Sequence, residues 1–110
     1  DVRDLIYIDD FVDAVILAAE KVNTYDPINI GAGKGYSLRD IQQMILQIDN
    51  YIGAVIKYDT SKPSMIPVRL IDIAKAEKTI GFSPKIGLRE GIGRTLQWYR
   101  EKYDPASQRQ

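Results

Sequence analysis

Three basic residues stand where their type and setting suit anion binding: Arg3 in the opening β-rich run, and Lys62 and Arg69 within and at the end of a proline-punctuated loop. A guanidinium presents a planar fork of donors that matches the oxygens of a diphosphate, whereas lysine offers a point charge. Spacing alone favours a plainer role for Arg3, an ion pair with Asp4 or Asp10. For Arg69 and Lys62 the plain alternative is a solvated side chain. The residues by themselves leave both interpretations open.

Two other patterns invite a chemical interpretation that their spacing does not support. The glycine-rich run 31–35 lies between a predicted strand and a predicted helix, but it matches neither the dinucleotide fingerprint nor the P-loop. We interpret it as a tight turn rather than a phosphate site. Asp9, Asp10 and Asp13 lack the spacing of a calcium-binding loop, and helix capping accounts for them.

Tyr58 and Lys62 have the i, i+4 spacing of a catalytic Tyr-x-x-x-Lys pair. That spacing brings two side chains onto one face only in a helix. Here the segment leaves a predicted strand and meets Pro63, which disfavours helix at the preceding residue. In an extended segment the two side chains start about 13 Å apart. We therefore exclude Tyr58 and Lys62 as a catalytic pair.

The aromatic residues Trp98, Tyr99 and Tyr103 have helical spacing near the end of the chain. We assign them to packing rather than to stacking on a base.

The side chains that are missing narrow the chemistry further. The 110 residues contain no histidine and no cysteine, which removes the commonest general base, the commonest transition-metal ligand and all disulfides. Fifteen basic and fifteen acidic side chains cancel, so the chain has no overall electrostatic footprint for nucleic acid or an anionic membrane. We expect no metal site, no nucleic-acid partner and no membrane partner.

The elements that position these residues follow from hydrophobic periodicity. We expect strands over 2–8, 28–30 and 54–58, and helices over 11–22, from Ser37 to about 48, from Asp72 to Gly81 and from Leu88 to Tyr103. This alternation predicts an α/β fold with a small, largely parallel sheet and packed helices. The first helix is apolar on two faces, which indicates that packing partners are missing. The polar stretch 104–110 is expected to be a flexible tail.

Four segments, in this order, resemble the last third of the extended short-chain dehydrogenase/reductase family, the NAD-dependent nucleotide-sugar epimerases and dehydratases. They are Arg3–Asp10, Ile28–Gly33, Arg69–Ala76 with Ile80–Pro84, and Leu88–Ile92 with Gln97–Tyr99. Each motif alone is weak, and the specificity comes from the ordered set. Asp59-Thr-Ser-Lys-Pro63 followed by Pro67 is most similar to the GDP-fucose synthase branch. The residues on either side of Pro67 depart from that branch, which has Asp-Gly-Thr before this proline and Arg after it.

The resemblance implies that residues 1–103 are the C-terminal nucleotide-sugar-binding portion of an extended Rossmann-type epimerase, without its N-terminal cofactor-binding domain. In the family, an arginine at the place of Arg3 contacts the nucleotide diphosphate. A basic residue at the place of Arg69 contacts the nucleotide, and we add Lys62 as a third binding residue. Two cations suit a diphosphate, whose charges must be met when it leaves water.

The implied parent enzyme is a GDP-4-keto-6-deoxymannose 3,5-epimerase/4-reductase, cytoplasmic and homodimeric. Its NADP or NAD would be bound by the missing domain, so we expect no cofactor and no catalytic residue in this sequence, and no turnover by the isolated chain. Two alternatives remain open. One is a UDP- or dTDP-sugar epimerase or dehydratase, and the other is a non-catalytic binding module on the same scaffold.

Overall fold

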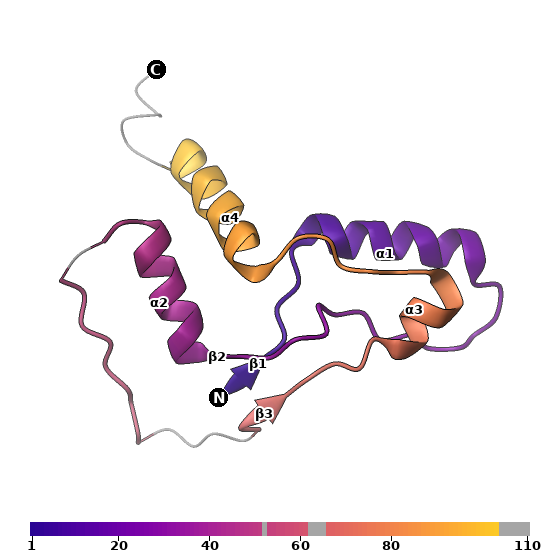
Figure 1. The fold of residues 1–110 in the computed structure, drawn as a ribbon, viewed down its shortest axis with the longest axis horizontal. Helices are drawn as coiled ribbons and strands as arrows, with labels where there is room; N and C mark the ends of the chain where they lie inside the picture. Colours follow the sequence, from indigo (N-terminus) through magenta and orange to yellow (C-terminus); the bar gives the residue numbers. More distant parts are fainter. Residues whose placement is uncertain (52, 62–65, 104–110) are drawn as a thin grey trace.

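The computed structural model describes residues 1–51, 53–61 and 66–103; the predicted tail 104–110 lies outside this range. Within it the chain forms, in order, β1 (Val2–Arg3), α1 (Ile8–Lys21), β2 (Tyr36–Ser37), α2 (Leu38–Ile48), β3 (Val68–Arg69), α3 (Ala74–Ile80) and α4 (Leu88–Tyr103). The helices contact each other in two pairs, α2 with α4 and α1 with α3. Figure 1 shows the two pairs on either side of the view, with the short strands between them at its lower edge.

The sheet has the strand order β2-β1-β3. β1 pairs with β3 in parallel and with β2 antiparallel. The predicted α/β fold with a small sheet and packed helices is therefore confirmed, and the sheet itself is mixed. Its central strand is the one that carries Arg3.

The predicted strands are shorter than expected or absent. Of the run 2–8 only Val2–Arg3 pairs with other strands, and 28–30 and 54–58 form no strand. A strand needs a neighbour to take up its N–H and C=O groups, and the described residues supply such neighbours only around β1. Ile28 and Ile30 nevertheless pack against the hydrophobic core. Their β-rich composition therefore indicated burial rather than strand pairing.

Local signals at the helix ends were more reliable. Ser37 Oγ accepts a hydrogen bond from the N–H of Asp40 at 3.0 Å and caps α2, at the position where the sequence predicted the helix to begin. Asp72 Oδ1 accepts from the N–H of Ala74 at the start of α3, and Gly81 ends α3 with φ of 67°. The cap predicted at Asp9 or Asp10 is wrong, because α1 begins at Ile8 after Tyr7, without a side-chain cap. Both aspartates lie in its first turn, where the helix dipole favours them.

The hydrophobic core is small and lies between α1 and α3, around Ala14, Ala76, Ile80 and Phe82. The opposite side of α1 presents a stripe of apolar side chains to solvent, with exposed fractions of 42 to 61%: Ile8, Phe11, Val12, Val15 and Ile16. The Cα radius of gyration is 17.3 Å, against about 13 Å for a compact domain of this length. The doubly apolar helix is thus confirmed, and one of its two faces is uncovered in the described structure.

Candidate functional site

The sheet places Arg3 and Arg69 side by side. They are register partners on the parallel strands β1 and β3, so their side chains leave the same face of the sheet, with backbones about 5 Å apart. Val2 and Val68, the other partners in this pair, occupy the opposite face. A Cβ at position 35 would come within 2.8 Å of Val2 Cγ1, so that position also lies on the valine face. The two guanidiniums therefore start from one surface, as a shared anion requires.

The two arginines differ in their own contacts. Arg3 Nη1 donates to the carbonyl oxygen of Val2 at 2.8 Å, and Nη2 lies 3.6 Å from Asp1 Oδ2. The plain alternative, an ion pair with Asp4 or Asp10, is therefore wrong in its partner, although Arg3 does contact a carboxylate. Its side chain is 27% exposed. Arg69 is exposed, and among the described residues its guanidinium has no hydrogen-bond or ion-pair partner.

The third predicted binding residue, Lys62, lies outside the described residues. Its sequence neighbour Ser61 donates to Asp59 Oδ1 through both its backbone N–H and its hydroxyl. These bonds, first the one from the side chain and then the one from the backbone, lower the pKa of Asp59 from its ordinary value of 3.8. Tyr58 lies outside every helix of the described residues, which agrees with excluding a helical Tyr-x-x-x-Lys pair.

Sequence reasoning missed Tyr36, which lies on the face of the sheet that carries Arg3 and Arg69. We call this surface the arginine face. Tyr36 of β2 is the register partner of Arg3 in the antiparallel pair. Residues directly opposite each other in such a pair share a face, so Tyr36, Arg3 and Arg69 form one row across the three strands. No local sequence signal marked Tyr36, because its place beside Arg3 depends on strand register.

The glycine-rich run 31–35 is occupied by a carboxylate of the chain itself. Asp4 Oδ1 accepts from the N–H of Ala32 at 2.8 Å, and Asp4 Oδ2 accepts from the N–H of Gly33 at 2.9 Å. Donors used in this way are not available to a phosphate, and the negative charge of Asp4 opposes one. This turn therefore does not fit the pyrophosphate of a dinucleotide cofactor, in agreement with its interpretation as a structural turn.

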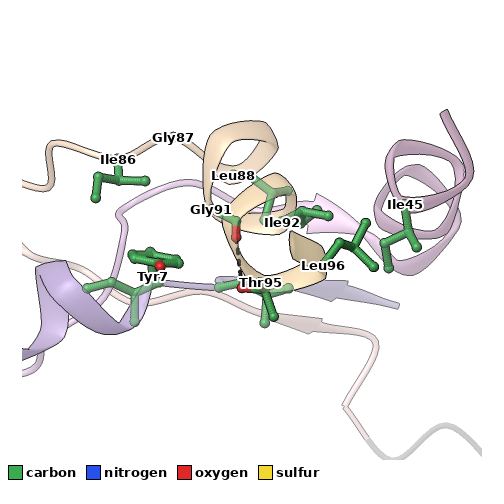
Figure 2. A pocket seen from close by; sticks show the side chains of 11 residues that line it. Tyr7, Ile45, Ile86, Gly87, Leu88, Gly91, Ile92, Thr95 and Leu96 are labelled. Atoms are coloured by element: carbon green, nitrogen blue, oxygen red, sulfur yellow. Dashed lines mark hydrogen bonds between the residues drawn. The ribbon is translucent and has the colours of Figure 1, made fainter. Parts of the chain in front are cut away.

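A cavity of about 290 Å³ lies between the segment after β1 and helices α2 and α4. Figure 2 shows it lined by the Tyr7 ring and by Ile45, Leu88, Ile92 and Leu96. Apart from Tyr7 and Thr95 its walls are apolar, and Thr95 Oγ1 donates to the carbonyl of Gly91. A cavity without a cation does not suit a diphosphate, so we do not place the ligand there.

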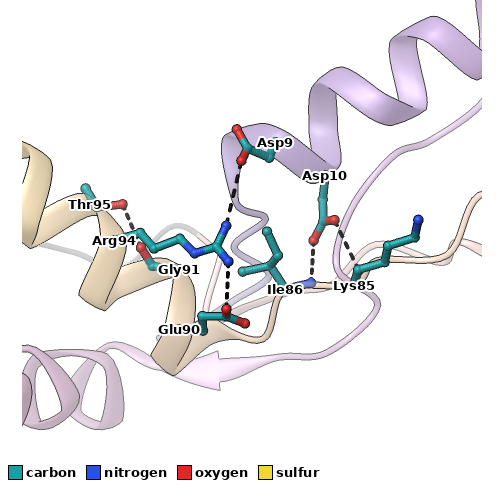
Figure 3. A network of polar contacts seen from close by, with 8 residues as sticks. All are labelled: Asp9, Asp10, Lys85, Ile86, Glu90, Gly91, Arg94 and Thr95. Carbon is teal, nitrogen blue, oxygen red and sulfur yellow. Dashed lines mark hydrogen bonds and ion pairs between the residues drawn. The ribbon is translucent and has the colours of Figure 1, made fainter.

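A polar network joins the start of α1 to the chain around α4 (Figure 3). The buried Asp10, which is 2% exposed, accepts from the backbone N–H groups of Lys85 at 3.1 Å and Ile86 at 2.9 Å. Arg94 lies 3.8 Å from Asp9 and donates to Glu90 at 2.8 Å. Two N–H donors occupy the Asp10 carboxylate, and no group of metal-ligating side chains is found in the described part of the chain. The aspartates therefore have structural roles.

The aromatic residues near the end of α4 contact one another. Trp98 and Tyr103 make an edge-to-face pair with centroids 6.0 Å apart, and Tyr99 and Tyr103 lie 5.0 Å apart. This agrees with packing, although all three rings are about half exposed.

No helix in the described ranges combines the length and apolarity needed to cross a membrane.

Comparison with known proteins identifies relatives of this chain. No protein-family model matches the chain. The GDP-L-fucose synthase of Escherichia coli (strain K12) is 31% identical over an alignment of 111 positions, which covers 93% of this chain and 34% of that protein. The chain spans about 30% of the length of the first curated relatives it matches.

Solved structures match over the same share of their length. The UDP-glucose 4-epimerase of Thermotoga maritima, solved with UDP-glucose, superimposes with a TM-score of 0.84 and 30% identity, covering 94% of this chain and 33% of that chain. A UDP-glucuronic acid 4-epimerase mutant of Bacillus cereus, solved with NAD and a fluorinated UDP-sugar, gives 0.82 and 28%, covering 93% and 33%.

Proposed function

Since the chain is homologous to about one third of an extended short-chain dehydrogenase/reductase of the NAD-dependent epimerase/dehydratase family, we propose that it binds the diphosphate of a nucleotide sugar. Arg3 and Arg69 are the binding residues. The observation that carries the proposal is their in-register pairing on adjacent parallel strands. Lys62, seven residues before Arg69 in the sequence, is proposed as a third contact.

The pairing of two arginines has a physical cost that a ligand removes. Like charges directly opposite one another in a sheet are destabilising. An anion between them converts repulsion into two charge-assisted contacts, each with fork geometry that matches phosphate oxygens. Asp1 partly neutralises Arg3, whereas the exposed Arg69 meets no carboxylate among the described residues. Arg69 is therefore the side chain most ready to take up an anion.

We propose a GDP-4-keto-6-deoxy sugar as the substrate of the parent enzyme, which makes this enzyme a GDP-fucose synthase. The identity to the E. coli GDP-L-fucose synthase and the proline-flanked loop before Arg69 support this choice. A UDP-sugar epimerase is the second candidate, because the T. maritima UDP-glucose 4-epimerase is 30% identical over nearly the same residues. Both candidate substrates carry the diphosphate that Arg3 and Arg69 would bind, and they differ in the base and the sugar.

In such an enzyme a nicotinamide cofactor, NADP or NAD, would supply the hydride chemistry. The glycine-rich turn 31–35 does not suit a dinucleotide, because Asp4 occupies its N–H groups. This chain contributes binding energy from the non-reacting nucleotide, which orients the sugar. We accordingly propose that the chain alone has no turnover, and that the parent is a cytoplasmic homodimer.

Calorimetric titration of the 110-residue chain with GDP, UDP and dTDP tests the proposal. Loss of a charge-assisted contact predicts that Arg3→Gln and Arg69→Gln each weaken diphosphate binding about tenfold or more. Arg39→Gln is the matched control, because Arg39 is an exposed arginine of α2 with no partner among the described residues. Failure of the wild type to bind any of the three nucleotides would refute the proposal, as would an equal loss in the control. The rank order of the three nucleotides decides between the GDP and UDP assignments.

A further inference from the structure

Tyr36 is held in place on the arginine face without a structural task of its own. It pairs with Arg3 across the antiparallel ladder, and the next residue caps α2. Gly35 before it is close-packed, because a side chain there would collide with Val2 and Leu70. The hydroxyl of Tyr36 has no hydrogen-bond partner within the described ranges, and its ring is only half-buried. A rigid, partly exposed aromatic side chain next to a paired cation is suited to contact a ligand.

A second cavity begins at Tyr36. It has a volume of about 260 Å³ and is lined by Leu5, Ala32, Lys34 and Tyr36 and by residues 84–88, which include Lys85. Unlike the apolar cavity near Tyr7, it has two lysines in its lining. Both lysines are exposed, and neither side chain has an ion-pair partner among the residues that the structure describes. The volume is smaller than that of a typical site for a drug-sized ligand, so it suits one ring rather than a complete nucleotide sugar.

We infer that Tyr36 and this cavity hold the nucleobase of the ligand whose diphosphate lies on Arg3 and Arg69. The inference rests on the proposed function and extends it to the recognition of the base. Every base offers a flat face for stacking on an aromatic ring. Lysine donors suit carbonyl and ring-nitrogen acceptors such as O6 and N7 of guanine. A base requires stacking and hydrogen bonding, and the ring of Tyr36 and the two lysines supply both.

Comparison of GDP with inorganic pyrophosphate separates the base from the diphosphate. Both probes engage the arginines, and only GDP reaches Tyr36 and the cavity. In titrations of the 110-residue chain, Tyr36→Ala should weaken GDP binding about tenfold while pyrophosphate binding stays within twofold of the wild type. Tyr36→Phe keeps the ring and should bind GDP like the wild type. Tyr25→Ala is the control, because Tyr25 is fully exposed in the turn after α1.

The outcomes separate this inference from the proposed function. If Tyr36→Ala binds GDP like the wild type, or loses GDP and pyrophosphate equally, the base site is refuted while the arginine site stands. If the wild type binds GDP no tighter than pyrophosphate, the base site is also refuted. If it binds neither, the proposed function fails and the inference with it. If circular dichroism shows that Tyr36→Ala is unfolded, the same titrations with GDP and pyrophosphate are made with Tyr36→Leu, which keeps a bulky side chain but lacks the ring.

Discussion

Arg3 and Arg69 face each other across a parallel strand pair, and their backbones are about 5 Å apart. Such a pair is unfavourable in the absence of an anion. The proposed affinity of the site for a diphosphate and its cost in stability would therefore have the same origin. This link makes the arrangement testable without any knowledge of the substrate.

Removing one of the two charges should stabilise the ligand-free chain. We expect Arg69→Gln to raise the free energy of unfolding by about 0.2–1 kcal/mol at low salt, because it relieves a direct like-charge contact. The gain should shrink in 0.5 M salt, where screening is strong. Urea denaturation at two salt concentrations measures it, with Arg39→Gln as the control. A clear loss of stability at low salt would contradict a repulsive pair.

Asp10 should be essential for the connection between α1 and the segment before α4. Its buried carboxylate accepts two backbone hydrogen bonds, and the amide of Asp10→Asn can accept only through its single oxygen. We expect a loss of about 1–3 kcal/mol in the free energy of unfolding, because one buried donor is left unsatisfied. Asp13→Asn, on an exposed position of the same helix, should change it by less than about 0.5 kcal/mol. Equal effects of the two substitutions would contradict the role of Asp10.

The two glycines of α4 should respond differently to alanine. A Cβ at Gly93 would lie 3.8 Å from Ile48, an ordinary contact, whereas one at Gly91 would lie 3.1 Å from Tyr7 Cδ1 and 3.3 Å from Tyr7 Cβ. Gly93→Ala should stabilise the chain by up to about 1 kcal/mol through helix propensity. Gly91→Ala should lose most or all of that gain to crowding. Thermal unfolding of both variants measures the difference, and an equal gain would show that Tyr7 moves aside freely.

Adjacent residues of α1 should differ sharply in their tolerance of charge. Leu17 packs against the core, whereas Ile16 belongs to the exposed apolar stripe and is 51% exposed. Leu17→Lys should cost several kcal/mol and unfold the chain, because it buries an unpaired charge. Ile16→Lys should change stability by less than about 0.5 kcal/mol and should reduce self-association in sedimentation experiments. Unfolding of Ile16→Lys would contradict the assignment of this face to the surface.

The loop around Asp59 provides a pH prediction. Ser61→Ala should raise the pKa of Asp59 toward its ordinary value of 3.8, because the side-chain hydrogen bond is the largest cause of its lowering. A lowered pKa in the folded state favours folding above the unfolded value, and that contribution is lost as the pH falls below about 4 through the folded value. The variant should lose part of it. A titration followed by NMR measures the shift, with the signals of the other carboxylates as an internal reference, and an unchanged Asp59 would contradict it.

Sequence reasoning succeeded where the interacting residues are close in the sequence and failed where they are far apart. Ser37, Gly81 and the limits Leu88–Tyr103 follow from signals within a few residues, and the structure has all of them. The partners of Asp10 lie 75 and 76 residues away in the chain, so its type and position suggested only a helix cap. Tyr36 was missed for the same reason, because its place beside Arg3 depends on strand register, which no local pattern encodes. The segment 28–30 was assigned as a strand because burial and strand pairing favour the same residue types.

The segment formed by β1 and the residue after it, Asp4, separates charge between its two sides. Consecutive side chains of an extended segment point in opposite directions, so Arg3 and Asp4 serve different neighbours. Asp4 fills the turn of backbone N–H groups that would otherwise attract phosphate, and Arg3 offers its cation on the other side. If the proposed site binds an anion, Asp4 would repel that anion from the glycine turn, and Arg3 and Arg69 would attract it. The adjacent residues Arg3 and Asp4 would then direct an anion to one of two adjacent surfaces.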